Sequence, residues 1–122
     1  MSAKMTKGMM EAAISEAMID FEKEYMGRGP RETKTYIIAD MVLVRLSGVL
    51  TPAEKQLTKS KEGAELIKKT RGALMESARV KLANIIKGIT SCQVKSLHSD
   101  ISTRTGERII IFVLGKNLEA EF

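Results

Sequence analysis

The segment from Arg108 to Leu114, RIIIFVL, constrains the fold more than any other part of this sequence. In an extended strand, successive side chains point to opposite faces, so this segment is apolar on both faces. One face would carry Ile109, Ile111 and Val113, and the other Ile110, Phe112 and Leu114. A strand of this kind belongs in the interior of a sheet that is covered on both sides.

Two hairpins are predicted to build that sheet. In the second, residues 93–103 form one strand, the turn 104–107 follows, and residues 108–114 form the other strand. Gly106 suits the turn because glycine accepts a positive φ at little cost. An earlier stretch rich in β-branched and aliphatic residues predicts strands at 34–38 and 41–47, joined at Ala39 and Asp40.

One helical region precedes the first hairpin, and a second lies between the two hairpins. Residues 6–26 carry an apolar stripe with Glu22 on the solvent side, and Gly27 suits the end of this helix. Thr51, Pro52 and Glu54 form a capping box with proline at the first helical position, so a second helix begins there. Residues 60–63 either kink or restart it. From residue 64 a long helix is expected to run to about residue 88, with Leu74 on its apolar stripe and Arg71 among its exposed charges.

The predicted order is therefore α-β-β-α-β-β. It indicates a two-layer α+β fold, with a mainly antiparallel four-stranded sheet and helices on one face. We expect one domain over residues 1–122, with residues 1–6 flexible. Since the helices of one chain cover one sheet face, a second subunit is expected to cover the other, and the sequence thus favours a homodimer.

Composition narrows the classes of function. The chain has 20 basic and 15 acidic residues, interspersed, and aromatic residues make up 4%, so a nucleic-acid-binding module ranks last among the hypotheses. Cys92 is the single cysteine, which excludes an intramolecular disulfide and a multi-cysteine metal site. Its small and apolar neighbours favour a buried hydrophobic side chain over a reactive thiol. No cofactor is expected. No apolar run approaches the roughly 20 residues of a membrane span, so we expect a soluble cytoplasmic protein.

The first strand of the second hairpin carries the candidate chemistry. His98, Asp100 and Ser102 alternate and share one strand face, which could make His98 and Asp100 an acid/base pair. Such neighbours lie roughly 6–7 Å apart, so the spacing does not ensure a direct hydrogen bond between His98 and Asp100. A metal site would need a third ligand, such as Asp40 or Glu107. Structural or subunit contacts, ligand or anion binding, and catalysis all remain open for this row.

Arginine-rich turns form the second group of candidates. The cluster GRGPR could cradle an anion or simply connect a helix to a strand with solvated arginines. The hairpin turn adds further polar residues. Together with His98 and Asp100, the candidates for ligand or partner contact are Arg28, Arg31, Thr103, Arg104 and Arg108. No catalytic or metal-binding residue is assigned.

Three segments resemble a family of small bacterial proteins, MpsC-like, long described as a domain of unknown function. They are FEKEYMGRGPRETKTYIIADMVLVRLSGVLTPAEKQL, EGAELIKKTR and SLHSDISTRTGERIIIFVL, and the resemblance covers about residues 12–118. The family name denotes the C component of a Na⁺-translocating, membrane-potential-generating system. The resemblance implies a soluble accessory to a membrane system for cation or inorganic-carbon uptake; it brings no catalytic residues with it.

Two further hypotheses stand beside that implication. The first is a non-enzymatic, homodimeric accessory or regulatory module that binds a protein partner, such as a membrane protein, or a small anion. The second is a small hydrolase or lyase that uses His98 and Asp100, and it requires a pocket around His98.

Overall fold

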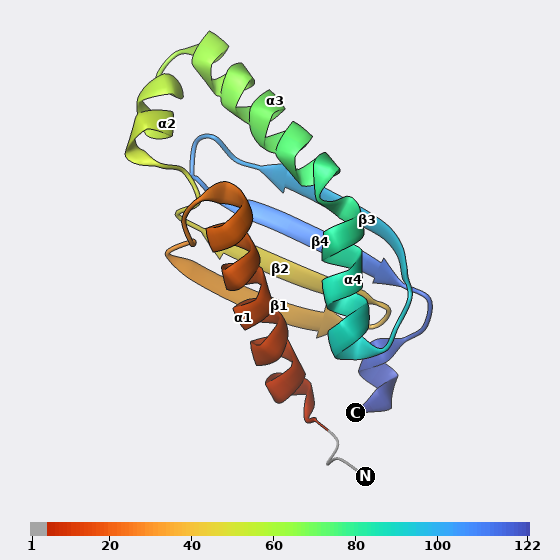
Figure 1. The fold of residues 1–122 in the computed structure, drawn as a ribbon. Helices are drawn as coiled ribbons and strands as arrows, with labels where there is room; N and C mark the ends of the chain where they lie inside the picture. Colours follow the sequence, from red (N-terminus) through yellow and green to blue (C-terminus); the bar gives the residue numbers. More distant parts are fainter. Residues whose placement is uncertain (1–4) are drawn as a thin grey trace.

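The computed structural model describes residues 5–122 and has the predicted α+β fold (Figure 1). The elements, in chain order, are α1 (Lys7–Met26), β1 (Glu32–Ile38), β2 (Met41–Ser47), α2 (Pro52–Leu57), α3 (Lys61–Ser77), α4 (Arg79–Thr90), β3 (Val94–Ile101), β4 (Arg108–Leu114) and the short 3-10 helix η1 (Leu118–Glu121). Of the segment expected to be flexible, residues 1–4 lie outside the described part. Thr6 caps α1, and its hydroxyl accepts a hydrogen bond from the Met9 amide at 3.1 Å.

The four strands form one antiparallel sheet in the order β1-β2-β4-β3. The two predicted hairpins are confirmed, and they join through β2 and β4, which therefore lie in the interior of the sheet. The first hairpin turns at Ala39, whose φ is +53°. The second turns through residues 102–107, longer than the predicted four-residue turn, and Gly106 has the expected positive φ of +74°.

Helices α1 and α4 lie side by side across one face of the sheet (Figure 1). The hydrophobic core lies between these two helices and the sheet. On β4, Ile110, Phe112 and Leu114 point into this layer and are at most 1% exposed. They meet Ile14, Met18 and Phe21 of α1, and Leu82 and Ile86 of α4.

The prediction of one long helix from residue 64 to residue 88 is wrong, because the helix is interrupted at Ala78. Ala78 has non-helical dihedral angles and separates α3 from α4. The side chain of Ala78 is 1% exposed, so the bend is packed against the core. The uncertainty at residues 60–63 is also resolved: Ser60 caps α3 through the Gly63 amide, and α2 ends at Leu57.

Three sequence-based assignments of side chains to the core or to solvent are wrong, two on α3 and one on α1. Leu74 is 37% exposed, whereas Met75 is buried. Arg71 is 3% exposed because it lies one helical turn from both Ile67 and Met75 on the inner side of α3. Glu22, expected in solvent, is 1% exposed because it lies one turn beyond Met18.

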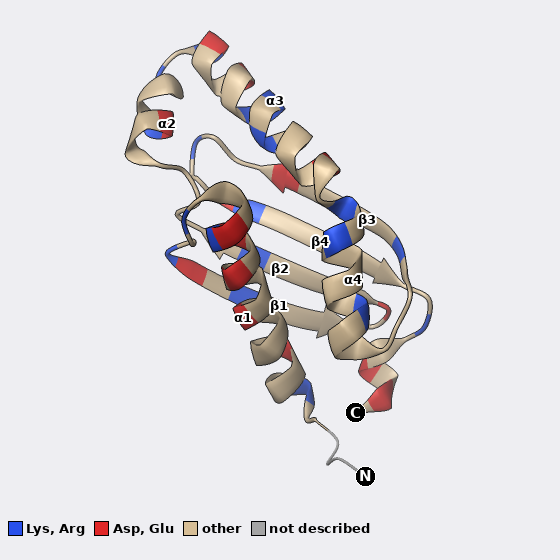
Figure 2. Cartoon of the chain, in the orientation of Figure 1, with Lys and Arg blue, Asp and Glu red and all other residues tan. Residues whose placement is uncertain are grey.

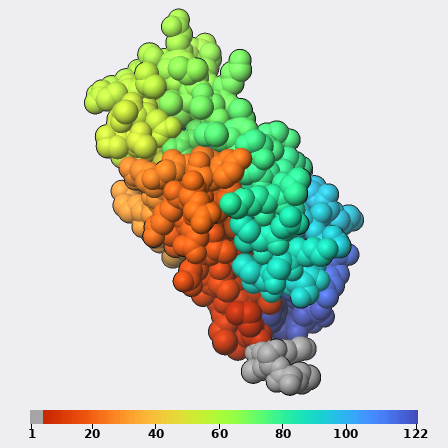
Figure 3. All heavy atoms as spheres, in the orientation of Figure 1, coloured from red at the N-terminus to blue at the C-terminus, as the bar shows by residue number. Residues whose placement is uncertain are grey.

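The α2–α3 segment extends past one end of the sheet (Figure 1) and forms the projecting end of the molecule in the space-filling view (Figure 3). Gly63 allows the tight corner between the two helices, since a β-carbon at this position would collide with the Leu57 carbonyl group. The strand ends that carry most of the sheet's charged residues lie beside this segment (Figure 2).

Candidate functional site

The sheet face opposite α1 and α4, here called the open face, carries a continuous apolar surface. In the described part of the chain, no helix lies across this face (Figure 1). Its apolar side chains are Tyr36, Ile38, Met41, Leu43, Ile109, Ile111 and Val113. Tyr36 and Ile38 are 39% and 45% exposed, and the other five are partly exposed. Large contiguous apolar surfaces of this kind are characteristic of sites that contact other molecules.

Charged residues border the apolar surface at the end nearest α2. Arg45 on β2 forms an ion pair with Glu107 at 2.7 Å, and Lys34 lies 3.9 Å from Glu32. With Tyr36 and Ser47, these residues line a shallow depression of about 180 Å³. The open face thus has an apolar centre and a charged rim at one end.

His98 and Asp100 lie on the open face at its β3 edge, and both are exposed. They share a face as predicted, but each side chain has a different partner. The His98 ring lies 3.2 Å from the Ser96 hydroxyl, while the Asp100 carboxylate accepts a hydrogen bond from the Ile101 amide and lies 3.4 Å from Lys68. Within residues 5–122, no hydrogen bond or ion pair joins His98 to a carboxylate, the partner that would orient its ring in an acid/base pair.

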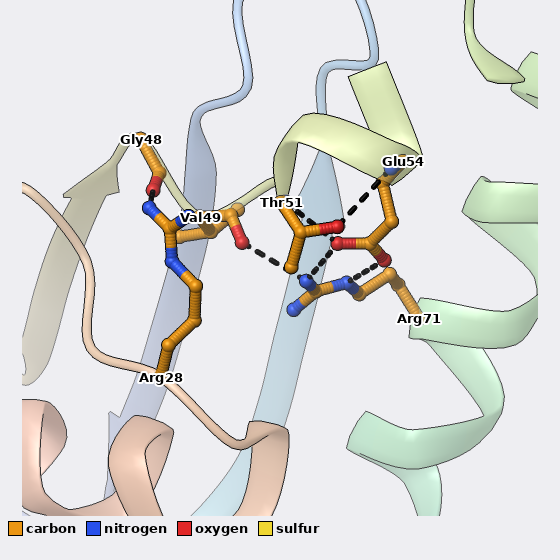
Figure 4. Close-up of polar contacts among 6 residues, drawn as sticks. All are labelled: Arg28, Gly48, Val49, Thr51, Glu54 and Arg71. Carbon is orange, nitrogen blue, oxygen red and sulfur yellow. Dashed lines mark hydrogen bonds and ion pairs between the residues drawn. The ribbon is translucent and has the colours of Figure 1, made fainter. Parts of the chain in front are cut away.

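The arginine-rich loop and the second hairpin turn lie at the same end of the sheet. The Val49 amide donates to the Gly106 carbonyl at 3.2 Å, which ties the segment after β2 to the turn. Arg28 donates to the Gly48 carbonyl at 3.0 Å (Figure 4), and the backbone of Arg31 pairs with Ser47. Both arginines are exposed.

The turn contributes two more of the predicted contact residues. Thr103 and Arg104 line an open depression of about 370 Å³ together with Asp100 and Lys68. Arg104 is exposed and Thr103 is partly exposed. The structure therefore gathers Arg28, Arg31, Asp100, Thr103 and Arg104 at one end of the sheet, with His98 further along β3.

Arg108, the remaining candidate, points the other way. It is 1% exposed, and its guanidinium donates to the Ser99 hydroxyl at 3.1 Å. The reason is strand alternation: Arg108 shares the inner side of β4 with Ile110, Phe112 and Leu114. Grouping it with the exposed turn overlooked that alternation.

An ion pair that the sequence did not reveal joins α2 to α3 (Figure 4). The Arg71 guanidinium donates to both carboxylate oxygens of Glu54, at 2.6 and 2.9 Å, and to the Val49 carbonyl at 2.9 Å. Burial opposes ionisation of Glu54, but the hydrogen bonds from Arg71 and Thr51 outweigh it and hold the pKa of Glu54 below its usual range. The capping box identified Glu54, and no sequence signal linked it to Arg71.

Glu22 and Arg108 form a second buried group beneath α1. Burial raises the pKa of Glu22, and the positive charges of Arg108 and Arg71 oppose that rise. Burial also lowers the pKa of Arg108, against the effect of the Glu22 carboxylate. Each charge therefore reduces the cost of burying the other.

Residues 5–122 contain no helix that is long and apolar enough to cross a membrane. In the same range, no group of three or more His, Cys, Asp or Glu side chains is placed to hold a metal ion.

Fold and site together define a small α+β domain with an uncovered apolar sheet face. The chain belongs to the MpsC family, described as "Na+-translocating membrane potential-generating system (MpsC)", whose model matches residues 6–116. It is 48% identical over 116 residues to the "Uncharacterized protein YbcI" of Bacillus subtilis (strain 168), covering 95% of this chain and 94% of that protein. It is 23% identical over 100 residues to the "Uncharacterized protein YrhF" of the same organism, covering 81% and 82% respectively. No solved structure matches the chain.

Proposed function

We propose that this protein is a non-enzymatic accessory subunit that acts through protein–protein contact, in a system that couples Na⁺ translocation to membrane potential. The observation that carries this proposal is the open face, where seven apolar side chains remain in contact with solvent. Burying such a surface against another protein is favourable by roughly 25 cal/mol per Å² of apolar area. Membership of the MpsC family supplies the process in which this contact would serve.

The experiment that tests this role measures membrane potential in cells that lack the gene. Deletion should reduce the Na⁺-dependent potential reported by a voltage-sensitive dye, and the wild-type gene should restore it. Ile111→Glu places a charge at the centre of the open face and should fail to restore it. Val80→Glu is the matched control, because Val80 is 74% exposed on α4, on the other side of the sheet. An unchanged potential after deletion, or full rescue by Ile111→Glu, would contradict the proposal.

A second contact, with an anionic group on a partner or a small anion, is favoured by the arginines at the end of the sheet. Arg28, Arg31 and Arg104 are exposed there. Guanidinium groups suit phosphate and carboxylate because they donate several hydrogen bonds in one plane. If this contact forms, phosphate or sulfate should raise the melting temperature of the wild-type protein more than that of Arg104→Ala. Equal shifts in the two proteins would count against it.

A further inference from the structure

The register of the sheet places the side chains of the open face in rows that run across all four strands. One row reads Lys34, Arg45, Ile109 and Asp100, from β1 to β3. The next reads Tyr36, Leu43, Ile111 and His98, and a third reads Ile38, Met41, Val113 and Ser96. The first row therefore has a basic half and an acidic edge, and the other two are apolar over most of their width.

The free edges of the sheet are less suited to another chain than the open face is. The Ile37 amide on β1 donates to the Glu11 carboxylate, and the Ala39 amide just after β1 donates to Glu119, both at 2.8 Å. On β3, the Leu97 carbonyl accepts from Arg79 at 3.2 Å. Adding a strand at either edge would displace these side chains. Contact through the open face leaves them in place.

We propose that a second copy of this chain covers the open face, related by a twofold axis that runs parallel to the strands between the two sheets. This inference rests on the proposed role of the open face and names its occupant. Such an axis places the same end of each sheet side by side and reverses the strand order across the interface. As a result, β1 of one copy faces β3 of the other. Lys34 then meets Asp100 of the second copy, and Tyr36 meets its His98.

Charge complementarity selects this orientation over the main alternative. An axis perpendicular to the strands would exchange the strand ends and lay the row of Lys34 and Arg45 against the row of Ile38, Met41 and Val113. That arrangement would desolvate two cations against apolar side chains. The parallel axis lays only one cation, Arg45, against an apolar side chain, Ile109, and it brings Lys34 and Asp100 together at both edges. It also matches the apolar rows with each other.

The ion pairs that Lys34 and Asp100 form within one chain do not prevent them from pairing with a second copy. Lys34 lies 3.9 Å from Glu32, and the side chains are 63% and 62% exposed. Asp100 lies 3.4 Å from Lys68, and these side chains are 73% and 55% exposed. Exposed pairs of this kind contribute little to stability, so both groups are available to a second copy. Charges at the border of an interface set its orientation more than its affinity.

Swapping the charges of Lys34 and Asp100, which lie at the two edges of the open face, tests the orientation of the second copy. Dimer dissociation would be measured by sedimentation equilibrium at low salt for the wild-type protein, Lys34→Asp, Asp100→Lys and the double variant. Each single variant places like charges opposite each other twice per dimer, so the dissociation constant should rise roughly tenfold or more. The double variant restores opposite charges and should return near the wild-type value. Dimerisation that the double variant fails to restore would overturn the parallel axis.

Ile111→Glu tests the face itself, with circular dichroism to confirm that the variant folds. It should be a monomer at concentrations where the wild-type protein and Val80→Glu are dimers. A wild-type protein that is monomeric at every concentration, while Ile111→Glu still fails to restore the Na⁺-dependent potential, would overturn the second copy and leave the accessory role intact. A dimer with full rescue by Ile111→Glu would instead contradict the accessory role of this face.

Discussion

Ile110 and Ile111 are consecutive on β4, yet they lie on opposite sides of the sheet. Ile110 is fully buried beneath the helices, and Ile111 lies on the open face. The same residue type, one position apart, therefore reports on two different environments.

This pair gives the first prediction. Ile110→Ala should lower the free energy of unfolding by roughly 2–5 kcal/mol at any protein concentration, because it opens a cavity in the core. Ile111→Ala should cost much less in dilute protein, and its cost should grow with concentration as the second copy covers the open face. Urea unfolding at two protein concentrations measures both effects. A concentration-independent loss at Ile111 equal to that at Ile110 would mean that the open face is covered by the chain itself.

Two glycines of α3 give the second prediction, in opposite directions. Gly63→Ala should destabilise the protein by about 2 kcal/mol or more, because the new β-carbon would collide with the Leu57 carbonyl at the α2–α3 corner. Gly72→Ala should stabilise it by about 0.5–1 kcal/mol, since Gly72 lies in the same helix and, apart from the neighbouring helix backbone, no atom lies within 4 Å of the added methyl group. Thermal unfolding compares the two directly. A stabilising Gly63→Ala would show that the corner can open.

The sequence was sufficient for the hairpins and the fold class, because local signals and strand alternation decide them. The apolar strand 108–114, the turn at Gly106 and the capping box at Thr51 each specify a local structure without help from distant residues. The prediction that the sheet has one face without helices followed from counting the elements, and the structure confirms it for residues 5–122.

The break at Ala78 and the buried charges could not be predicted in the same way. Ala78 carries no helix-breaking signal, and its bend is stabilised by packing against the core. Glu22, Arg71 and Arg108 are polar residues whose burial depends on charges that lie far apart in the sequence. Hydropathy patterns place such residues in solvent. Of the candidate residues, Arg28, Arg31, Asp100, Thr103 and Arg104 lie at the same end of the sheet, while Arg108 points into the core. Their role in ligand or partner contact stays a prediction.

Arg104 and Arg108 give the third prediction. The sequence places both arginines among the candidates for ligand or partner contact, and replacing a contact residue in solvent is expected to change stability little. Since Arg108 is buried, Arg108→Ala should lower the free energy of unfolding by roughly 3 kcal/mol, because Glu22 would lose a nearby positive charge. Arg104→Ala should change it little, since Arg104 is exposed. Adding Glu22→Gln to Arg108→Ala should recover part of the loss. Equal and small effects at both arginines would mean that the charge of Arg108 is not needed in the core.

The fourth prediction concerns the pH dependence contributed by Glu54. The pKa of Glu54 in the folded protein is lower than in the unfolded chain, where a glutamate has a pKa of about 4.3. The ionised form therefore stabilises the fold above that pH, and this contribution is lost as the pH falls through the folded-state pKa. Glu54→Gln cannot ionise, so it should be less stable than the wild-type protein by roughly 1–3 kcal/mol near neutral pH.

Urea unfolding at several pH values between about 3 and 7 measures that difference. The gap between wild type and Glu54→Gln should be widest above the unfolded-state pKa and should close in acid, where Glu54 is protonated and resembles glutamine. Burial raises the pKa of Glu22, which therefore contributes the opposite slope, with stability falling as pH rises. The Glu54 charge adds less to that rise than burial does, so most of the Glu22 contribution is common to the two proteins. Glu76→Gln serves as the control, because the Glu76 side chain is 71% exposed and its contact with Arg79 is 3.5 Å long. A gap for Glu54→Gln that stayed constant across this pH range would show that the hydrogen bonds from Arg71 and Thr51 do not depend on the charge of Glu54.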